Sequence, residues 1–443
     1  MIKKVTAAAL TFAMCFLLAS CGKNADKQPD CEHQYGDWVV KTKATCEEEG
    51  QQERSCSICG QAEVQQIPMT EHTYKKDNNL CKKCYYVDFD PNAEVAELGC
   101  FSQYWYTTNN PTANEVWDVK IWGDLVYRGA GDYNKNSGVT PILAFNKQTQ
   151  RWVKLSDTED QAIQRFVEID GTLYAPGIDP AGSWDLGNYY VLDAEQWKQV
   201  RNLPGGLHNF DMIAFDGKIF AGLETETPAD TVAVSQDKGE SFTFVPLYRD
   251  GVLFDTSGYE YSRTFAFVEC KGSLYALIRF KKNNVTDYDA FIFRYADGKM
   301  EYQSVADSRL QGTSGRNLWQ GKLEWKGTCY VTSTALNAIT DFSKPETHKQ
   351  IPMPNGGVVT DILLYNDELY VLSFVFKEDM SYSVVIYKSE AGEEGSFTEV
   401  TSFDYAGMPI SFDFDGNHFY IGIGSSFADS SKAGMVLRVK PAA

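Results

Sequence analysis

Seven copies of one short sequence pattern recur along the chain and limit what it can fold into. Each copy is an apolar run, a tight turn built on Gly or on Asn-Asp, and then an apolar pair, which is the signature of a β-hairpin. The copies occupy residues 117–126, 166–174, 212–220, 267–275, 323–330, 362–370 and 412–419. Their turn residues lie 40 to 55 residues apart, a repeat length typical of β-propeller blades.

Most copies are followed by a second hairpin, as at residues 142–155 and 291–302. Two hairpins supply the four strands that one propeller blade contains. The seventh repeat ends after a single further strand at 434–439, and a spare strand, residues 98–106, precedes the first repeat. We therefore predict an all-β fold, a seven-bladed β-propeller over residues 98–443, in which the spare strand completes the last blade so that no long edge stays open.

The first residues have the features of an export signal. Lys3 and Lys4 precede a mostly apolar stretch, which ends in Leu18-Ala19-Ser20-Cys21. This ending resembles the lipobox of bacterial lipoproteins. The resemblance implies a lipoprotein signal peptide over residues 1–20, cleavage after residue 20, and acyl chains on Cys21 as a membrane anchor. The polar residues that follow Cys21, up to residue 30, are interpreted as a short tether. An ordinary signal peptide or an amphipathic N-terminal segment is the alternative.

Charge narrows the range of partners. The formal net charge is −19 at pH 7, and so acidic a chain repels nucleic acid and anionic lipid. We expect no nucleic-acid partner, and we expect the membrane to be contacted through the lipid anchor. The predicted localisation is extracytoplasmic, on the surface of a bacterial cell.

Residues 31–86 form a predicted second module, joined to the propeller by a linker over residues 87–97. It contains two Cys-x-x-Cys pairs and two histidines, a set of residues that suits tetrahedral zinc. The eight candidate ligands are Cys31, His33, Cys46, Cys56, Cys59, His72, Cys81 and Cys84. Three disulfides, as in small exported domains, are the alternative.

The spacing leaves the ligand sets open. One partition groups His33, Cys46, Cys56 and Cys59, with Cys31, His72, Cys81 and Cys84 as the second set. Pairing both Cys-x-x-Cys turns in one site is equally allowed. The repeated His-x-Tyr at His33 and His72 indicates two related half-units.

The module's pattern resembles a Cys/His-rich repeat of Gram-positive surface proteins. The matching positions run from Cys31-x-His33 through Ala44-Thr-Cys46 and Cys56-x-x-Cys59-Gly60 to His72-x-Tyr74. The resemblance implies a small structural module displayed outside the cell and supplies no activity. Zinc is the cofactor expected in this module, and no cofactor is predicted for the propeller.

One turn within the propeller resembles the Asp-box found in sialidases and other carbohydrate-active propellers. Its residues are Ser235, Asp237, Gly239 and Phe242. The resemblance implies a structural role, in which the Ser and Asp side chains satisfy turn backbone groups. The Arg-Ile-Pro signature expected of a sialidase is missing from the sequence.

Ligands of propellers usually meet the face opposite the repeated Gly turns, where the other loops gather. Basic and aromatic residues in or beside those loops are the predicted ligand-binding set, and an ordinary structural role is the alternative for each. They are Arg165, Trp184, His208, Tyr259, Tyr261, Arg263, Arg316 and Trp319. His208 and Arg263 precede their turn glycines by the same spacing, so we expect them at equivalent positions of the channel mouth.

Three cysteines of the propeller, Cys100, Cys270 and Cys329, are interpreted as buried free thiols. The sequence contains no recognisable catalytic motif. We predict a non-enzymatic, cell-surface binding module for an extracellular protein or glycan. A glycan-active enzyme with its site at the propeller mouth is the alternative, and an assembly scaffold with a broad apolar patch is a third class.

Overall fold

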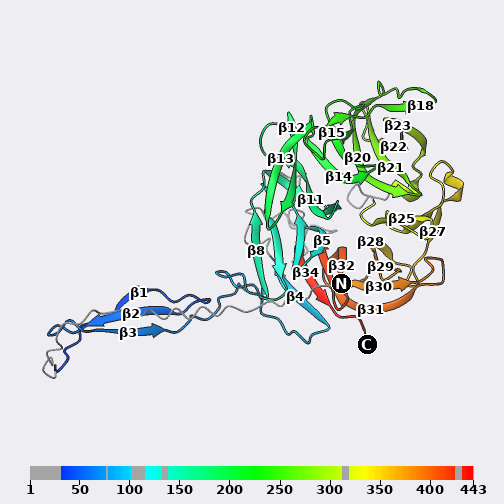
Figure 1. Cartoon of the computed structure of the whole chain (residues 1–443). Coiled ribbons are helices and arrows are strands. Elements are labelled where there is room, and N and C mark those ends of the chain that lie inside the picture. The colour runs from blue at the N-terminus through cyan, green and yellow to red at the C-terminus, as the bar shows by residue number, and fades with distance from the viewer. Residues whose placement is uncertain are drawn as a thin grey trace, which may run out of the picture. The chain divides into compact units, whose positions relative to one another are not determined.

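The computed structural model describes residues 31–75, 78–100, 115–131, 138–311, 319–424 and 432–442. It contains two compact units, Met1–Glu71 and His72–Ala443, which are described separately (Figure 1). The predicted signal peptide, Cys21 and its tether lie outside the described residues, as does Arg316.

The first unit is a small antiparallel sheet in the order β1-β2-β3, formed by β1 (Val39–Thr42), β2 (Gly50–Ser55) and β3 (Ala62–Ile67). Among its described residues only Cys46, Gly50 and Cys56 are buried. A unit with so little buried apolar surface needs cross-links or metal ions for stability.

The second unit is the seven-bladed propeller that the repeats predict (Figure 1). Blade 1 contains β5 (Val116–Trp122), β6 (Leu125–Ala130), β7 (Ile142–Asn146) and β8 (Arg151–Ser156); blade 2 contains β10 (Val167–Ile169), β11 (Thr172–Pro180), β12 (Leu186–Asp193) and β13 (Gln196–Pro204). Blade 3 contains β14 (His208–Phe215), β15 (Lys218–Thr225), β16 (Val232–Ser235) and β17 (Thr243–Phe244). Blade 4 contains β20 (Tyr259–Cys270), β21 (Ser273–Lys282), β22 (Tyr288–Ala296) and β23 (Lys299–Val305).

The remaining blades complete the ring. Blade 5 contains β24 (Lys322–Trp325), β25 (Thr328–Thr332), β26 (Leu336–Ile339) and β27 (Lys349–Ile351); blade 6 contains β28 (Val358–Tyr365), β29 (Glu368–Phe376), β30 (Tyr382–Ser389) and β31 (Thr398–Tyr405). Blade 7 contains β32 (Met408–Phe414), β33 (Phe419–Gly424), β34 (Met435–Val439) and, as its fourth strand, β4 (Val95–Cys100). Shorter elements outside the four-stranded pattern are β9 (Asp160–Ile163), β18 (Leu247–Arg249), β19 (Val252–Leu253), α2 (Ser308–Gln311) and η2 (Pro345–Thr347).

The spare N-terminal strand closes the ring as predicted. β4 pairs antiparallel with β34, so that Ala96 lies opposite Arg438 and Cys100 opposite Met435. The strand covers residues 95–100, and residues 101–106 of the predicted strand lie outside the described residues. Residues 78–89 also pack on the propeller: Leu80 and Val87 are fully buried with Leu98 and Val126. The second compact unit therefore includes residues that the sequence assigned to the Cys/His module and to the linker.

The backbone conformation of the repeated hairpin turns explains why Gly, Asn and Asp recur there. In five of the seven copies both central turn residues have positive φ, as in Asp170-Gly171 (49° and 74°) and Asn366-Asp367 (50° and 62°). Such turns match the twist of the flanking strands, and Gly, Asn and Asp adopt them at the lowest cost. The turns gather at one end of the ring, which we call the bottom face, and the opposite end is the top face.

Buried aspartates join the innermost strands of neighbouring blades. Asp118 accepts a hydrogen bond from the backbone N–H of Phe166 in the next blade at 2.6 Å. In the same way, Asp211 accepts from the N–H of residue 267 at 2.7 Å, and Asp361 accepts from the N–H of residue 412 at 3.0 Å. All three follow a β-bulge at the same place in their hairpins. The bulge lets each carboxylate reach the neighbouring blade and fixes the blades around the central channel.

The turn after β16 has the contacts that the Ser-x-Asp-x-Gly pattern predicts. The Ser235 Oγ accepts a hydrogen bond from the Gly239 N–H at 2.8 Å, and Asp237 accepts one from the Ser241 N–H at 2.9 Å. Phe242 is buried and meets Tyr189 edge-on at 6.0 Å. The turn therefore fixes blade 3 against blade 2 and has a structural role.

Candidate metal centre and propeller mouth

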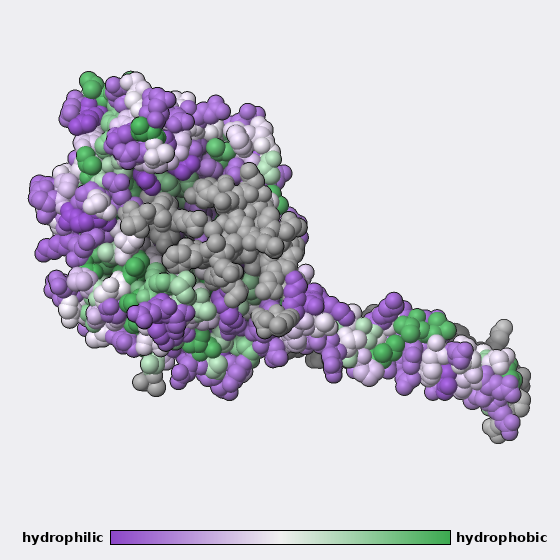
Figure 2. Space-filling view, turned by 180° about the vertical axis from the view of Figure 1, so that it is seen from behind, coloured by the Kyte–Doolittle hydropathy of each residue, from purple (hydrophilic) through white to green (hydrophobic). Residues whose placement is uncertain are grey.

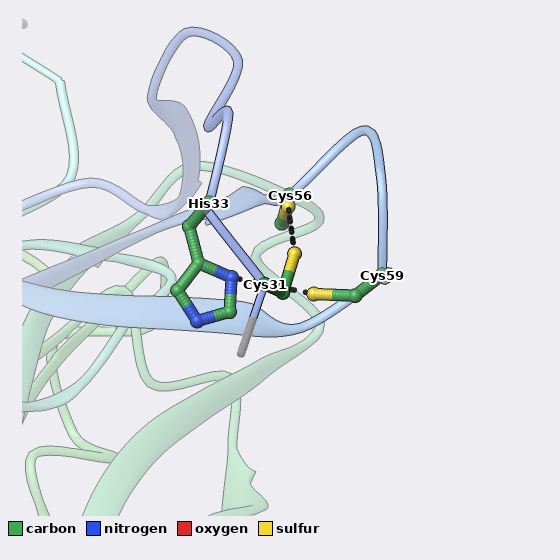
Figure 3. Close-up of side chains that lie close together, drawn as sticks. All are labelled: Cys31, His33, Cys56 and Cys59. Carbon is green, nitrogen blue, oxygen red and sulfur yellow. Dashed lines mark hydrogen bonds between the residues drawn. The ribbon is translucent and has the colours of Figure 1, made fainter. Parts of the chain in front are cut away.

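Four side chains of the first unit converge on one point: Cys31, His33, Cys56 and Cys59 (Figure 3). Their ligand atoms all lie within 4.8 Å of one another. The Cys31 and Cys56 sulfurs are 3.9 Å apart, and the Cys59 sulfur lies 3.3 Å from His33 Nδ1. A disulfide would need about 2.05 Å between sulfurs, so these cysteines are free thiols in this structure.

The spacing fits a tetrahedral zinc ion. Zn–S bonds of about 2.3 Å and Zn–N bonds of about 2.0–2.1 Å imply S–S edges of about 3.8 Å and S–N edges of about 3.5 Å. The observed 3.9 and 3.3 Å separations are close to both values. The group of three sulfurs and one imidazole nitrogen is therefore able to hold a metal ion with four ligands.

The Cys-x-x-Cys turn positions two of these ligands. The Gly60 N–H donates to the Cys56 carbonyl at 2.9 Å, and Gly60 takes a φ of 74°, which bends the chain so that both thiols point the same way. The Ile58 N–H donates to the Cys56 sulfur at 3.4 Å. Burial acts to raise the pKa of Cys56, but hydrogen bonds from the Cys59 backbone and from His33 outweigh it and lower that pKa to about 5. This favours the thiolate, which is the form that binds metal.

The second half-unit repeats this geometry in the second compact unit. The Tyr85 N–H donates to the Cys81 carbonyl at 3.1 Å, and Tyr85 has a φ of 59°, in the place of Gly60. The Cys84 sulfur lies 3.3 Å from His72 Nδ1. An isolated bridge joins Tyr74 to Cys81 just as one joins Tyr35 to Cys56. His72, Cys81 and Cys84 thus form a second group able to hold a metal ion.

The ligand sets differ from the partition considered first in the sequence analysis. Cys31, rather than Cys46, joins His33, Cys56 and Cys59. The two Cys-x-x-Cys turns contribute to different groups and do not share one site. Cys46 is buried beside Thr45, whose carbonyl accepts a hydrogen bond from the Thr70 N–H at 2.8 Å. Spacing alone leaves Cys31 and Cys46 equivalent, because only the strand pairing decides which cysteine meets which turn.

At the top face, three neighbouring blades meet through paired strand ends. Ile178 of β11 pairs with His208 of β14, and Glu224 of β15 pairs with Arg263 of β20. His208 Nδ1 lies 2.6 Å from Glu224 Oε2, and Arg263 Nε donates to the same oxygen at 2.5 Å. The predicted pair His208 and Arg263 therefore meets on one carboxylate. Burial acts to raise the pKa of Glu224, but His208 and Arg263 outweigh it and lower that pKa.

The other predicted ligand-binding residues are scattered. Tyr261 lies beside Arg263, whose guanidinium carbon is 4.9 Å from the ring centroid. Tyr259 donates to Asp289 at 2.9 Å, and Trp184 is 56% exposed on the loop after β11.

Two predicted ligand-binding residues lie in the interior. Arg165 pairs with Asp211 at 3.2 Å and donates to the Trp319 carbonyl, while the fully buried Trp319 packs on Phe342. Trp319 is a core residue, so a role in stacking on a ligand does not fit its position.

Several residues of the mouth carried no signal in the sequence. Glu224 lies inside a strand, and Arg279 and Tyr288 become neighbours of Arg263 and Tyr261 only through the pairing of β20, β21 and β22. Cys270 and Cys329 form a disulfide between blades 4 and 5. The prediction of free thiols is therefore wrong for these two cysteines, whereas Cys100 forms no disulfide and its buried thiol donates to the Ala433 carbonyl at 3.2 Å.

No protein-family model matches the sequence, and no curated protein matches it. Solved structures with a similar arrangement include BamB from Moraxella catarrhalis (10% identity, TM-score 0.39, 84% of this chain and 98% of that one) and the β-propeller domain of the Trilobed protease from Pyrococcus furiosus (12%, 0.39, 70% and 91%). The computationally designed Ika8 protein matches with 10% identity and a TM-score of 0.41, over 74% of this chain and 96% of that one. The fold assignment rests on the strand pairing described above.

A search of the described residues for a helix of the length and apolarity needed to cross a bilayer finds none.

Proposed function

We propose that this chain is an extracytoplasmic, lipid-anchored protein that binds an extracellular protein or glycan at the top face of its propeller. The observation that carries the proposal is the polar and aromatic cluster at the mouth, where His208 and Arg263 from adjacent blades meet on the Glu224 carboxylate and Tyr261 lies beside Arg263. Clustered charged and aromatic side chains at converging loops are typical of recognition sites.

The Cys270–Cys329 disulfide supports the proposed location. Disulfides persist in oxidising compartments and are rare in the bacterial cytoplasm. Anchoring is assigned to Cys21 on the basis of the lipobox-like Leu18-Ala19-Ser20-Cys21. Replacing Cys21 by Ser should abolish metabolic labelling of the chain with a radioactive fatty acid, and labelling that persists would contradict the assignment.

Binding is tested with the full-length chain on a glycan array and with candidate extracellular proteins by surface plasmon resonance. Tyr261→Ala alters the top face, and Lys218→Gln alters the bottom face, where Lys218 pairs with the turn residue Asp216. We expect the top-face variant to lose binding and the bottom-face variant to keep it. Equal loss in both variants, or in neither, would place the ligand elsewhere, and release of glycan fragments would favour the enzyme alternative.

We also propose that the metal of the Cys/His groups is zinc, and that the Ser235–Phe242 turn is an Asp-box. In an oxidising compartment, thiols as close as those of Cys31 and Cys56 oxidise unless a metal holds them. Elemental analysis of the purified full-length protein should find at least one zinc per chain. Cys59→Ser should remove one equivalent, whereas Cys100→Ala, a cysteine outside both groups, should remove none. Disulfides among Cys31, Cys56 and Cys59, detected by mass spectrometry, would exclude zinc there.

A further inference from the structure

Residues 78–89 form a short hairpin at the place where the first and last blades of the propeller meet. The two halves of this hairpin pair through an antiparallel bridge between Leu80 and Val87. Its turn is the second Cys-x-x-Cys, from Cys81 to Cys84. We call residues 78–89 the closing hairpin, and we call the junction between β4 of blade 7 and β8 of blade 1 the seam.

The first half of the closing hairpin is bonded to blade 7. Asn79 Nδ2 donates to the Glu97 carbonyl of β4 at 2.7 Å, and Asn78 Nδ2 donates to the Cys100 carbonyl of β4 at 3.1 Å. β4 is the outermost strand of blade 7, and the edge strand of a sheet needs a cover for its polar backbone groups. The closing hairpin supplies part of that cover.

The second half of the closing hairpin is bonded to blade 1. The Val87 N–H donates to the Gln150 carbonyl at 2.8 Å, and the Trp152 N–H of β8 donates to the Tyr85 carbonyl at 3.0 Å. Between these two contacts, Tyr86 forms an antiparallel bridge with the first residue of β8. One hairpin is therefore bonded to the outer strands of both the first and the last blade.

Apolar side chains of the closing hairpin fill the seam. Leu80 and Val87 are fully buried, and they pack in one cluster with Leu98 of β4 and Trp152 of β8. On the side of the propeller seen in Figure 2, hydrophobic residues form small separate patches among hydrophilic ones. If the closing hairpin left the seam, these four apolar side chains would become exposed to water together, which is unfavourable.

The second metal-binding group holds the turn of the closing hairpin. His72 Nδ1 lies 3.3 Å from the Cys84 sulfur, and the His72 ring stacks on the Tyr86 ring at 4.8 Å. A two-stranded hairpin is only marginally stable in water by itself, so the shape of the closing hairpin depends on what fixes its turn. An ion held by His72, Cys81 and Cys84 would fix both the turn and the ring that stacks on its second half.

We infer that metal binding at His72, Cys81 and Cys84 closes the seam of the propeller, because the ion holds the closing hairpin in the shape that bonds blade 7 to blade 1. This inference rests on the proposed zinc of the Cys/His groups and gives the second group a role of its own. The first group lies in the other compact unit. Loss of the ion from the second group should loosen the seam and leave the more distant blades folded.

The test compares hydrogen exchange of the full-length protein with bound zinc and after removal of zinc by a chelator, followed by mass spectrometry. Peptides that cover the Val87 and Trp152 amides should exchange at least about tenfold faster without zinc, because local opening of the seam then needs less free energy. The Phe267 amide, which donates to Asp211 between blades 3 and 4, should keep its rate. Adding zinc back should restore slow exchange at the seam.

Two matched variants assign the effect to one metal group. Cys84→Ser and Cys59→Ser change the second cysteine of the two Cys-x-x-Cys turns, and each should lower the bound zinc by one equivalent. Only Cys84→Ser should exchange rapidly at Val87 and Trp152, and added zinc should not slow that exchange. Cys59→Ser should match the zinc-loaded parent chain at the seam. The chelated parent chain covers the case in which Cys84→Ser does not fold.

The outcomes separate the inference from the proposed function. If zinc is bound and its removal leaves exchange at the seam unchanged, the inference is wrong while the zinc proposal stands. Equal acceleration in both variants would contradict the inference, since the effect would not belong to the second group. If Cys84→Ser is loosened but zinc does not protect the chelated parent chain, the thiol itself holds the seam and the inference is wrong. If the purified protein contains no zinc, the zinc proposal and the inference fail together, and binding at the top face is still tested by its own variants.

Discussion

Several carboxyl groups inside the propeller are buried, and burial disfavours their ionised form. Burial raises the pKa of Asp118 to about 6, although the Phe166 N–H and the charge of Arg165 act in the opposite direction. Burial also raises the pKa of Asp160 to about 6 and that of Asp361 well above its ordinary value. Asp118 and Asp361 join blades through hydrogen bonds, so the ring depends on groups that are easier to bury when protonated.

The propeller should therefore become less stable as the pH rises from about 4 to about 6. An unfolded Asp titrates near pH 3.9, so in this range the folded state holds the proton of Asp118 and the unfolded state has released it. Stability then falls with rising pH, by about 2 to 3 kcal/mol for a shift of this size. Urea unfolding of the parent chain across this pH range checks the sign.

The variant Asp118→Asn isolates the contribution of Asp118 to the pH dependence of stability. The amide oxygen of Asn can still accept the Phe166 N–H, and it does not titrate, so the pH dependence should become flatter. Asp157→Asn is the matched control, because the Asp157 side chain is 79% exposed and should leave the slope as it is. An Asp118→Asn chain whose stability changes with pH between 4 and 6 as steeply as that of the parent chain would show that Asp118 does not hold its proton in the folded state over this range.

At the scale of strands, one covalent bond joins two blades. Cys270 lies at the end of β20, and Cys329 lies in β25 of the next blade, with 5.9 Å between their Cα atoms. Both are buried. The bond closes a loop of 59 residues and so restricts the unfolded chain, which is the main way in which a disulfide stabilises.

The double variant Cys270→Ala/Cys329→Ala should unfold at a lower urea concentration, with a loss of about 4 kcal/mol for a loop of this length. The free energy of unfolding of this variant should be the same with and without a reducing agent. That of the parent chain should fall toward the value of the variant once the disulfide is reduced. Thiol alkylation of the unreduced, denatured parent chain that labels Cys270 would contradict the disulfide directly.

Local sequence patterns were enough to predict the β-hairpins. The disulfide and the residues of the propeller mouth depend on which distant strands pair, which local patterns do not show. The turn in Asp170-Gly171 and its copies is fixed by residues that tolerate positive φ, so the hairpins and their number could be predicted from neighbouring residues alone. The disulfide could not, because nothing near Cys270 or Cys329 states that the two strands face each other. The same holds for Glu224, which becomes part of the mouth only through pairing with β20. Trp319 lies near loop residues in the sequence but packs inward in the structure.

At the scale of the whole molecule, the ring closes by joining the two ends of the propeller. β4 and β34 are separated by more than 300 residues, yet their pairing covers the last exposed edge of blade 7. Leu98 of β4 is fully buried, and its carbonyl accepts a hydrogen bond from Trp152 Nε1 at 2.5 Å. β4 is thus held by blade 1 as well as by blade 7, so loss of its packing should affect both.

Leu98→Ala tests this closure. Removing a buried leucine side chain lowers the free energy of unfolding by about 2 to 5 kcal/mol. The structure should loosen most in blades 1 and 7, which hold β4. We expect hydrogen exchange to accelerate most at the amides of β34 and β8, because local opening frees the edge that β4 covers. Val305→Ala, in the outer strand of blade 4 and 52% exposed, is the matched control and should change stability by less than about 0.5 kcal/mol. If β34 keeps the protection of the parent chain in Leu98→Ala, then β4 does not hold the ring closed, and the sevenfold arrangement must derive its stability from contacts between the other blades.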